Sequence, residues 1–509
     1  MRRRRPNFLL SVAIFSSAAT LASVAVAQVT GTGSLYPPEA ATPVQLISQT
    51  PVDPESKTTT VITSSRAAEN RELAKALGPA AYILNNVGAS NEFSAIVRQA
   101  VGRHPAYHSQ VSALDEIRAE RRRATSALYP QLSTQFRGDY SIARDFGQNT
   151  DNAVEALRPR EQFTAGISAS QLVFDGGATF QRIKSARARN SEFKNALSTR
   201  INDLSLASLA AYHDYATHQA LLSLGDAFIL RHAKILDDVK ERERLGAGSK
   251  ADVTRAIARL AAAQARVAEI RESKQLAEIR YLEFFGETPG ILHRPSFDAF
   301  SVETRDQAIT AALTRSPEIA VASARADASQ ADYRAAKGAR LPEVRVSVDA
   351  VKFDLFDSGD DFDVRAGVNL NYNIFGGGAR SADIAQAASR ARQNQFGADQ
   401  IRQEVARDAA IAFERVQGAS ARLKALETAV VAHDETRELV LERYRVARGD
   451  LIDVLQAEND YFEAGVAYLT GLANRDMAVY GVMEHTGDLL RFFSPQEEYA
   501  DIMSEVGNG

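Results

Sequence analysis

The sequence contains one long module twice. Three short segments recur in the same order: residues 126–132 match 338–344, residues 172–178 match 373–379, and residues 245–253 match 446–454. The second pair shares Phe-x-Gly-Gly-Ala, and the third pair ends in Asp-Val in both copies. Each copy spans more than 180 residues, whereas the units of solenoids and propellers have roughly 20–50. The sequence therefore predicts a large module duplicated within one chain.

The start of the sequence has the pattern of an export signal. Four arginines precede an apolar run, and Ala25-Val26-Ala27 before Gln28 is typical of a cleavage site. We therefore expect residues 1–27 to be a signal peptide that takes no part in the fold. Beyond it, no apolar run approaches the ~20 residues of a membrane-spanning helix.

Composition excludes several kinds of site and partner. The chain has no cysteine, which excludes disulfides, thiolate metal sites and a lipid-modified cysteine, so we do not expect a lipoprotein. Four of the 60 basic residues lie in the signal, and the remaining 56 face 64 acidic residues, a formal net charge of −8. This excess of acid argues against a nucleic-acid partner.

Two long segments without proline predict very long helices. About 70 residues lie between Gly177 and Leu245, and about 70 between Gly378 and Ala447, in which only isolated glycines interrupt the pattern. Helices of that length would extend roughly 100 Å, too far for a globular core. Apolar residues in the second segment alternate at spacings of four and three, as in a coiled coil. They are Val405, Ala409, Ala412, Val416, Ala419, Leu423, Leu426 and Val430.

Shorter helices are expected beside the long ones. Each long segment ends at a reversal tip that contains glycine, Gly246 and Gly248 in the first copy and Gly449 in the second. Return helices are predicted at about 250–285 and 451–487. Half-length helices are predicted before the strands, at about 92–128 and 304–341. Their lengths predict four helical columns per chain, two of them built from half-length helices stacked end to end.

Between the half-length and the long helices, the apolar period changes to two, the period of a β-strand. Four strands are predicted, at about 131–143, 162–174, 343–355 and 362–375, in two hairpins. Glycines at the passage from strand to long helix are predicted hinges. They are Gly176, Gly177, Gly376, Gly377 and Gly378.

Two interpretations of these strands compete, a half-buried sheet in a soluble domain and strands that face lipid. Charged residues on the polar face, lengths of about 9–11 residues and aromatic residues near the strand ends favour lipid. Four strands cannot close a barrel, which needs about eight, so a barrel would require an oligomer.

Taken together, these features resemble the TolC family of outer-membrane efflux and type I secretion channel proteins. The resemblance covers about residues 91–488. It is carried by the paired proline–strand junctions, the paired Phe-x-Gly-Gly helix starts and residues 444–455, Tyr-Arg-Val-Ala-Arg-Gly-Asp-Leu-Ile-Asp-Val-Leu.

The family resemblance implies an α+β membrane protein that acts as a homotrimer. Four strands per chain would complete one transmembrane β-barrel in the bacterial outer membrane, and the coiled-coil helices would continue it as a periplasmic tunnel. The resemblance also implies a passive exit duct for efflux or type I secretion, whose partners are a periplasmic adaptor (membrane fusion) protein and an inner-membrane transporter. From the residues alone, a periplasmic coiled-coil adaptor or structural rod with a small soluble β-domain is the alternative.

The resemblance places the channel entrance at the reversal tips. It implies that Asp453 lines the entrance, where three copies would form an acidic ring with affinity for cations. Gln456 occupies the position of a second acidic ring in the best-studied member, so only one ring is expected. The resemblance also implies a hydrogen bond between Tyr444 and Asp252 that holds the entrance closed. Both aspartates could instead be ordinary acids of a helix first turn.

An arginine link next to this hydrogen bond in the family is not reproduced. Gly449 and Ala251 stand at the two positions that would form it. The nearby Arg448 or Asp450 could replace the link.

No catalytic pattern is found. The eight histidines show no metal-binding spacing, and we expect His104-Pro105 to start a helix. An acidic cluster between Asp354 and Asp363 lacks the distal glutamate of an EF-hand. Gly376-Gly377-Gly378 lacks the Lys-Ser/Thr of a phosphate loop. We therefore expect neither an enzyme nor a bound metal or cofactor.

The predicted organisation follows from these patterns. The signal peptide (1–27) precedes an N-terminal extension (28–90) that is partly disordered and weakly helical near its end. The first repeat covers 91–289, the second covers 303–488, and a C-terminal tail covers 489–509.

Overall fold

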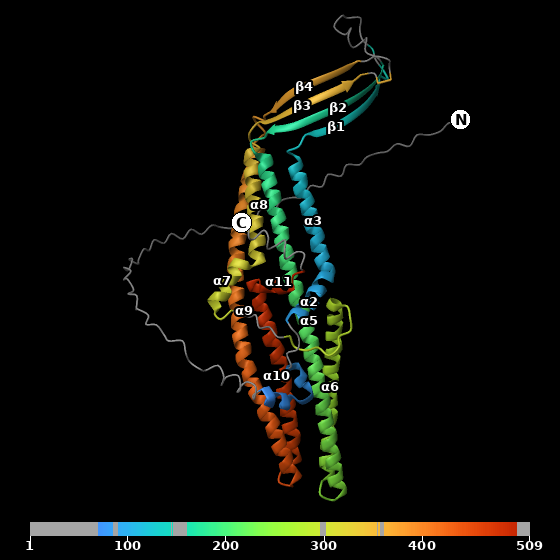
Figure 1. Ribbon diagram of the computed structural model, residues 1–509, viewed down its shortest axis with the longest axis vertical. Coiled ribbons are helices and arrows are strands. Elements are labelled where there is room, and N and C mark those ends of the chain that lie inside the picture. The colour runs from blue at the N-terminus through green and yellow to red at the C-terminus, as the bar shows by residue number, and fades with distance from the viewer. Residues whose placement is uncertain are drawn as a thin grey trace, which may run out of the picture. The chain divides into compact units, whose positions relative to one another are not determined.

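The computed structural model describes residues 70–84, 90–143, 145, 160–295, 302–353, 355–356 and 361–495. All of them fall within one compact unit, Val61–Gly509 (Figure 1). The predicted signal peptide, most of the N-terminal extension, the tips of both hairpins and the last 14 residues lie outside the described residues.

The described elements repeat in the order and lengths of a duplicated module. Residues 70–77 are helical and lead into the 3₁₀ helix η1. In chain order the elements are η1 (Gly78–Leu84), α2 (Ser90–Arg103), α3 (Pro105–Ser126), β1 (Gln131–Tyr140), β2 (Glu161–Phe174), α5 (Ala178–Arg244), α6 (Lys250–Phe285), α7 (Arg305–Arg315), α8 (Pro317–Gly338), β3 (Glu343–Lys352), β4 (Phe362–Asn371), α9 (Ala379–Arg445), α10 (Leu451–Thr486) and α11 (Asp488–Phe493). The long helices α5 and α9 have 67 residues each, and the return helices α6 and α10 have 36 each.

Shorter helices lie along each long one. Helix α5 packs against α6, α3 and α8, and α9 packs against α10, α8 and α7. Figure 1 shows α3 and α8 beside the halves of α5 and α9 nearest the sheet, and α6 and α10 beside the other halves. None of the helices within the described ranges is long and apolar enough to span a membrane.

Each predicted half-length helix is two helices, so the prediction of single helices at 92–128 and 304–341 was wrong. The breaks lie at His104–Pro105 and Ser316–Pro317. Proline lacks an N–H and suits the first position of a new helix, but it cannot continue the preceding one. As expected, His104 starts a helix: its Nδ1 accepts a hydrogen bond from the Ala106 N–H at 3.1 Å.

The two predicted hairpins join into one antiparallel sheet with the order β1-β2-β3-β4. Strands β2 and β3 pair from Ala165 opposite Lys352 to Phe174 opposite Val344. Three strands are shorter than predicted and end at Tyr140, Lys352 and Asn371. Strand β4 ends at Asn371 because its partner there, Glu343, follows a proline, which has no N–H to extend the ladder.

Hydrophobic side chains gather in three main clusters along α5. The first lies where α3 begins and α6 and α10 end, and it contains Tyr212, Tyr281 and Phe493. A second cluster joins the middle of α5 to α10. A third joins the last turns of α5 and α9 to the start of α10. Each cluster therefore connects α5 to helices from the second half of the chain.

The end of the N-terminal extension belongs to the core, which the sequence did not indicate. Leu73, Leu77 and Ile83 are buried in the second cluster. The Tyr461 hydroxyl of α10 donates a hydrogen bond to the carbonyl oxygen of Ala76 at 2.5 Å. Residues 70–84 therefore hold α5 and α10 together.

A buried ion pair fixes the segment after α6 to α10. The Arg294 guanidinium contacts both Asp476 oxygens, Nε to Oδ2 at 2.5 Å and Nη2 to Oδ1 at 2.9 Å. Arg475 Nε lies 3.2 Å from the same carboxylate. Nearby, burial lowers the pKa of His213 to about 4, and its Nε2 lies 3.1 Å from the Tyr480 hydroxyl.

We predict that Asp476→Leu lowers the free energy of unfolding by about 3 kcal/mol, because Arg294 is left buried without its carboxylate. The double variant Asp476→Leu/Arg294→Met should recover most of that loss. Urea unfolding followed by circular dichroism measures both. As a control, Asp399→Leu removes the exposed Asp399–Arg402 pair and should cost less than about 1 kcal/mol. A double variant no more stable than Asp476→Leu would contradict the prediction.

Candidate functional site

The two reversal tips have the same backbone geometry. The N–H groups of Ala247 and Arg448 donate to the carbonyl oxygens of Arg242 and Arg443, at 2.8 and 2.9 Å. Gly246 has a positive φ of 76°, and Ala447 takes the corresponding conformation in the second tip with a φ of 57°. A residue with a side chain is strained at such a φ, so the backbone of the second tip is more strained than that of the first.

The other two tip glycines matter through close packing. A Cβ on Gly248 would lie 3.1 Å from the Glu243 nitrogen, and one on Gly449 would lie 3.3 Å from the Tyr444 nitrogen. Both tips therefore fold tightly against the last turn of their long helix.

Glycine also governs the turns from the sheet into the long helices. Gly176, Gly177, Gly377 and Gly378 have positive φ values, whereas Gly376 does not. A Cβ on Gly176 would lie 2.4 Å from the carbonyl oxygen of Gly338, at the end of α8. The first turn therefore requires glycine both for its conformation and for its contact.

Asp252 makes its contacts within the first turn of α6. The Ser249 hydroxyl accepts the Asp252 N–H at 3.1 Å and donates to Asp252 Oδ2 at 2.7 Å. Arg255 Nη1 lies 3.5 Å from Oδ1. No hydrogen bond joins Asp252 to Tyr444 in the described part of the chain. Within one chain, Asp252 is therefore an ordinary acid of the first helical turn, because both of its oxygens already have partners.

Within one chain, Arg242 rather than Asp252 contacts Tyr444. Its Nη2 donates to the carbonyl oxygens of Tyr444 and Arg445, at 3.0 and 3.2 Å. Its guanidinium carbon also lies 4.2 Å from the centre of the Tyr444 ring, a cation–π distance. Burial raises the pKa of Tyr444, and Arg242 opposes that shift. The last turn of α5 is thereby bound to the last turn of α9.

Arg242 could not be singled out from the sequence. It is one of several basic residues in the last turns of α5 and α9. A cation there interacts favourably with the negative end of its own helix, so its type and position are ordinary. Only the structure shows that it reaches the last turn of α9.

The remaining predicted entrance residues are exposed. Asp450 precedes α10 as its N-cap, and Asp453 lies in the first turn. Gln456 donates through Nε2 to Asp460 Oδ1 at 2.7 Å. Among the ion pairs of the described residues, none involves Arg448, Asp450 or Asp453, so the replacement link proposed for Arg448 or Asp450 does not form within one chain.

A buried charge cluster lies on α5, α9 and α10, farther from the tips. Glu458 of α10 is 1% exposed, and its oxygens lie 3.5 Å from Arg437 Nη1 and 3.8 Å from Arg231 Nε. Arg437 also lies over the Tyr461 ring, at 3.7 Å from the ring centre. Arg437 Nη2 also lies 2.6 Å from Asp434 Oδ1, so the charge of this α9 residue is compensated from its own helix and from α10.

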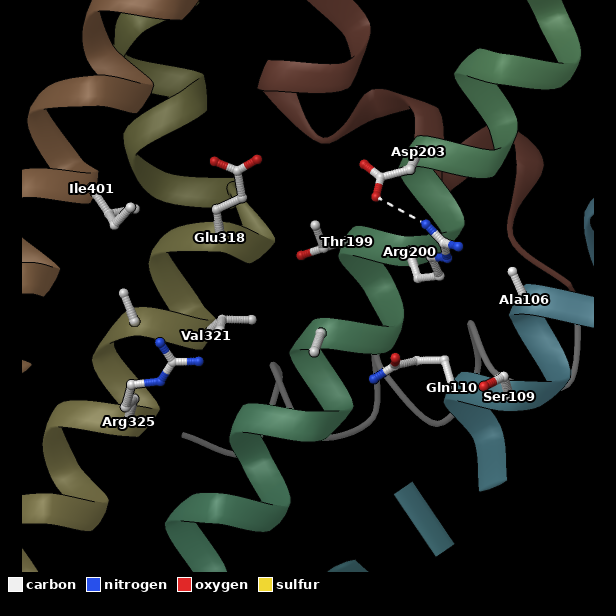
Figure 2. Close-up of a pocket in the computed structure, with 12 residues that line it drawn as sticks. Ala106, Ser109, Gln110, Thr199, Arg200, Asp203, Glu318, Val321, Arg325 and Ile401 are labelled. Carbon is white, nitrogen blue, oxygen red and sulfur yellow. Dashed lines mark ion pairs between the residues drawn. The ribbon is translucent and has the colours of Figure 1, made fainter. Parts of the chain in front are cut away.

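A cavity of about 480 Å³ lies among α3, α5, α8 and α9, and Figure 2 shows the residues that line it. Asp203 of α5 and Glu318 of α8 line it, and burial raises the pKa of both carboxyls. Burial likewise raises the pKa of Glu484, in α10, to about 7. Within the described ranges, no three His, Asp or Glu side chains are grouped closely enough to hold a metal ion.

Comparisons with known proteins agree with the resemblance. Residues 308–488 match the family model described as outer membrane efflux protein. Outer membrane efflux protein BepC of Brucella suis is 25% identical over 387 residues, which cover 74% of this chain and 82% of that protein. Protein CyaE of Bordetella pertussis is 27% identical over 338 residues, 63% of this chain and 70% of its own.

Solved structures share the fold. The outer membrane protein VceC of Vibrio cholerae aligns with a TM-score of 0.68 and 18% identity, over 78% of this chain and 96% of its own. The CmeC outer membrane channel of Campylobacter jejuni aligns with a TM-score of 0.69 and 15% identity, over 81% and 88%. The chain therefore shares the fold of these outer-membrane channels, and its residues 308–488 match the outer membrane efflux protein family.

Proposed function

We propose that this protein is a passive exit duct in the bacterial outer membrane, working as a homotrimer in an efflux or type I secretion system. The observation that carries the proposal is an open sheet with a largely exposed apolar face at one end of long helices. Leu132, Phe136 and Val368 in this sheet are 71–76% exposed. Exposed apolar patches of this kind mark a surface made for lipid or another protein.

The open edges of the sheet support an oligomer. The outer strands β1 and β4 each have one unpaired edge in a single chain. Pairing β4 of one copy with β1 of the next would satisfy both edges, and three copies would supply twelve strands, above the minimum of about eight.

The long helices support the same proposal. Helices α5 and α9 have equal length, yet 28 positions of α5 are buried and only nine of α9. Large apolar side chains are left exposed along α9, including Phe396 at 70%. Neighbouring copies would cover this face.

The entrance is proposed at the reversal tips. Asp453 is exposed there without an ion-pair partner among the described residues, and three copies would bring three carboxylates around one axis. Arg242 would hold the two tips of each chain together and keep the entrance closed. Docking of a periplasmic adaptor and an inner-membrane transporter would supply the energy to separate them.

Planar-bilayer recording tests the proposed function. Purified protein should give reproducible conductance steps, because a closed barrel continued by a helical tunnel leaves an aqueous path. A protein that stays monomeric in detergent and gives no steps would instead support the alternative, a periplasmic rod or adaptor.

We predict that Arg242→Ala raises the open population of the channel. The variant loses two charge-assisted hydrogen bonds, each worth about 1.5–3 kcal/mol, so the open-to-closed ratio should rise about tenfold or more. Single-channel recording measures this ratio. The control is Arg244→Ala, whose guanidinium pairs with Glu241 of the same helix. Equal open populations in the two variants would rule out Arg242 as the link that closes the entrance.

We predict that Asp453→Asn weakens block by multivalent cations. Three copies lose three charges at the entrance, so the blocking concentration should rise about tenfold or more. The control, Asp399→Asn, removes an exposed carboxylate of α9 that is 46 residues before the end of that helix at Arg445, and it should leave the block unchanged. Unchanged block in Asp453→Asn would show that this residue does not line the entrance.

A further inference from the structure

A basic groove lies between α7, α9 and α10. It has a volume of about 770 Å³. Its lining includes Arg305 at the start of α7, Ile411, Arg415 and Arg422 from α9, and Met477 and Ala478 from α10. The groove thus combines cationic walls with an apolar floor.

The arginines of this groove have few carboxylate partners among the described residues. Arg415 and Arg422 are exposed and make no ion pair with any residue that the structure describes. Arg305 reaches only its neighbour Asp306, at 3.9 Å. Glu414 also lines the groove, so three guanidinium groups face one carboxylate. This excess of positive charge favours an acidic occupant.

A glycine deepens the groove between its two central arginines. Ile411, Arg415, Gly418 and Arg422 are spaced by four, three and four residues, so they share one face of α9. Glycine inside a helix costs roughly 0.5–1 kcal/mol relative to alanine. A Cβ on Gly418 would meet nothing within 4 Å, so no contact inside the described chain requires a glycine there. An occupant of the groove would account for it.

The chain itself contains a segment of the required chemistry. Residues 496–509, called here the acidic segment, include four carboxylates and no Lys, Arg or His. The carboxylates are Glu497, Glu498, Asp501 and Glu505, and large apolar residues lie between them: Tyr499, Ile502, Met503 and Val506.

The acidic segment is long enough to reach the groove. The last described residue, Pro495, follows α11, which begins directly after α10. Ala478 lies nine residues before Gly487, which is roughly 14 Å along α10. Fourteen extended residues span roughly 45 Å, enough to return past α11 to this position.

We propose that the acidic segment binds in this groove on its own chain. Its carboxylates pair with Arg305, Arg415 and Arg422, and its apolar residues cover Ile411 and Met477. The bound segment joins α7, α9 and α10, as residues 70–84 join α5 and α10.

Cysteine cross-linking of the full-length protein tests the proposal, since the native chain contains no cysteine. The test variant carries Met503→Cys with Ala478→Cys in the groove. The control carries Met503→Cys with Leu230→Cys, on an exposed position of α5. Oxidation should produce an intrachain disulfide about tenfold faster in the test variant than in the control, which corresponds to about 1.4 kcal/mol of preference for the groove.

Two further substitutions in the test variant separate binding from chance collision. Gly418→Leu fills the groove and should slow cross-linking about tenfold. Its matched control, Gly397→Leu, also faces open space on α9 and should leave the rate unchanged. Both replace a helix glycine by a better helix former, so neither is expected to unfold the protein.

Charge exchange completes the test. Arg415→Glu with Arg422→Glu should slow cross-linking about fivefold, and adding Glu498→Arg with Asp501→Arg should restore it. The proposal is overturned if the test and control pairs react at equal rates or if Gly418→Leu has no effect. It is also overturned by a product with the mass of two chains, which would place the acidic segment on a neighbouring copy.

Discussion

Lateral burial of α5 is the interaction on which the rest of this structure depends. A 67-residue helix gains most of its stability from packing rather than from intrinsic propensity. The three main hydrophobic clusters all include α5 residues, and they join it to the start of α3, to residues 70–84 and to the reversal tips. Because α5 spans the distance from the sheet to the tips, it fixes the separation between those two ends of the described chain.

The duplicated modules are equal in length but unequal in packing. Helix α9 repeats α5 in length, yet most of its surface is uncovered, and the sheet leaves both edges open. Additional copies of the chain around a common axis would both cover α9 and pair the open edges of the sheet. The proposed duct is this assembly, with lipid on the apolar face of the sheet and an entrance at the tips.

Much of the fold could be predicted because the duplication fixes lengths. The long and return helices follow from proline-free stretches that end at glycine turns, and the strands follow from their period of two. The helix start at His104-Pro105 was expected, but not that it would divide the helix predicted at 92–128. The break before Pro317 was missed because this residue lies inside an otherwise regular helical pattern. The burial of Leu73 and Leu77 could not be predicted, because a short apolar helix does not reveal which partner covers it.

The candidate site was predicted less completely than the fold. The tip glycines follow from the sequence pattern, and the entrance role of Asp453 is implied only by the family resemblance. The link between the tips depends on which side chain of α5 reaches the end of α9. Arg242 therefore emerges only from the structure, where it binds the end of α9, while Asp252 is occupied by Ser249 and Arg255.

Closure of the sheet by three copies is the central claim, and cross-linking of its open edges tests it most directly. Cysteines placed along β1 and β4, such as Phe136→Cys with Val368→Cys and neighbouring pairs, would react only where the two edges meet. The account predicts a ladder of covalent products that stops at three chains. Products that remain single chains at every pair, or a ladder that continues beyond three, would contradict it.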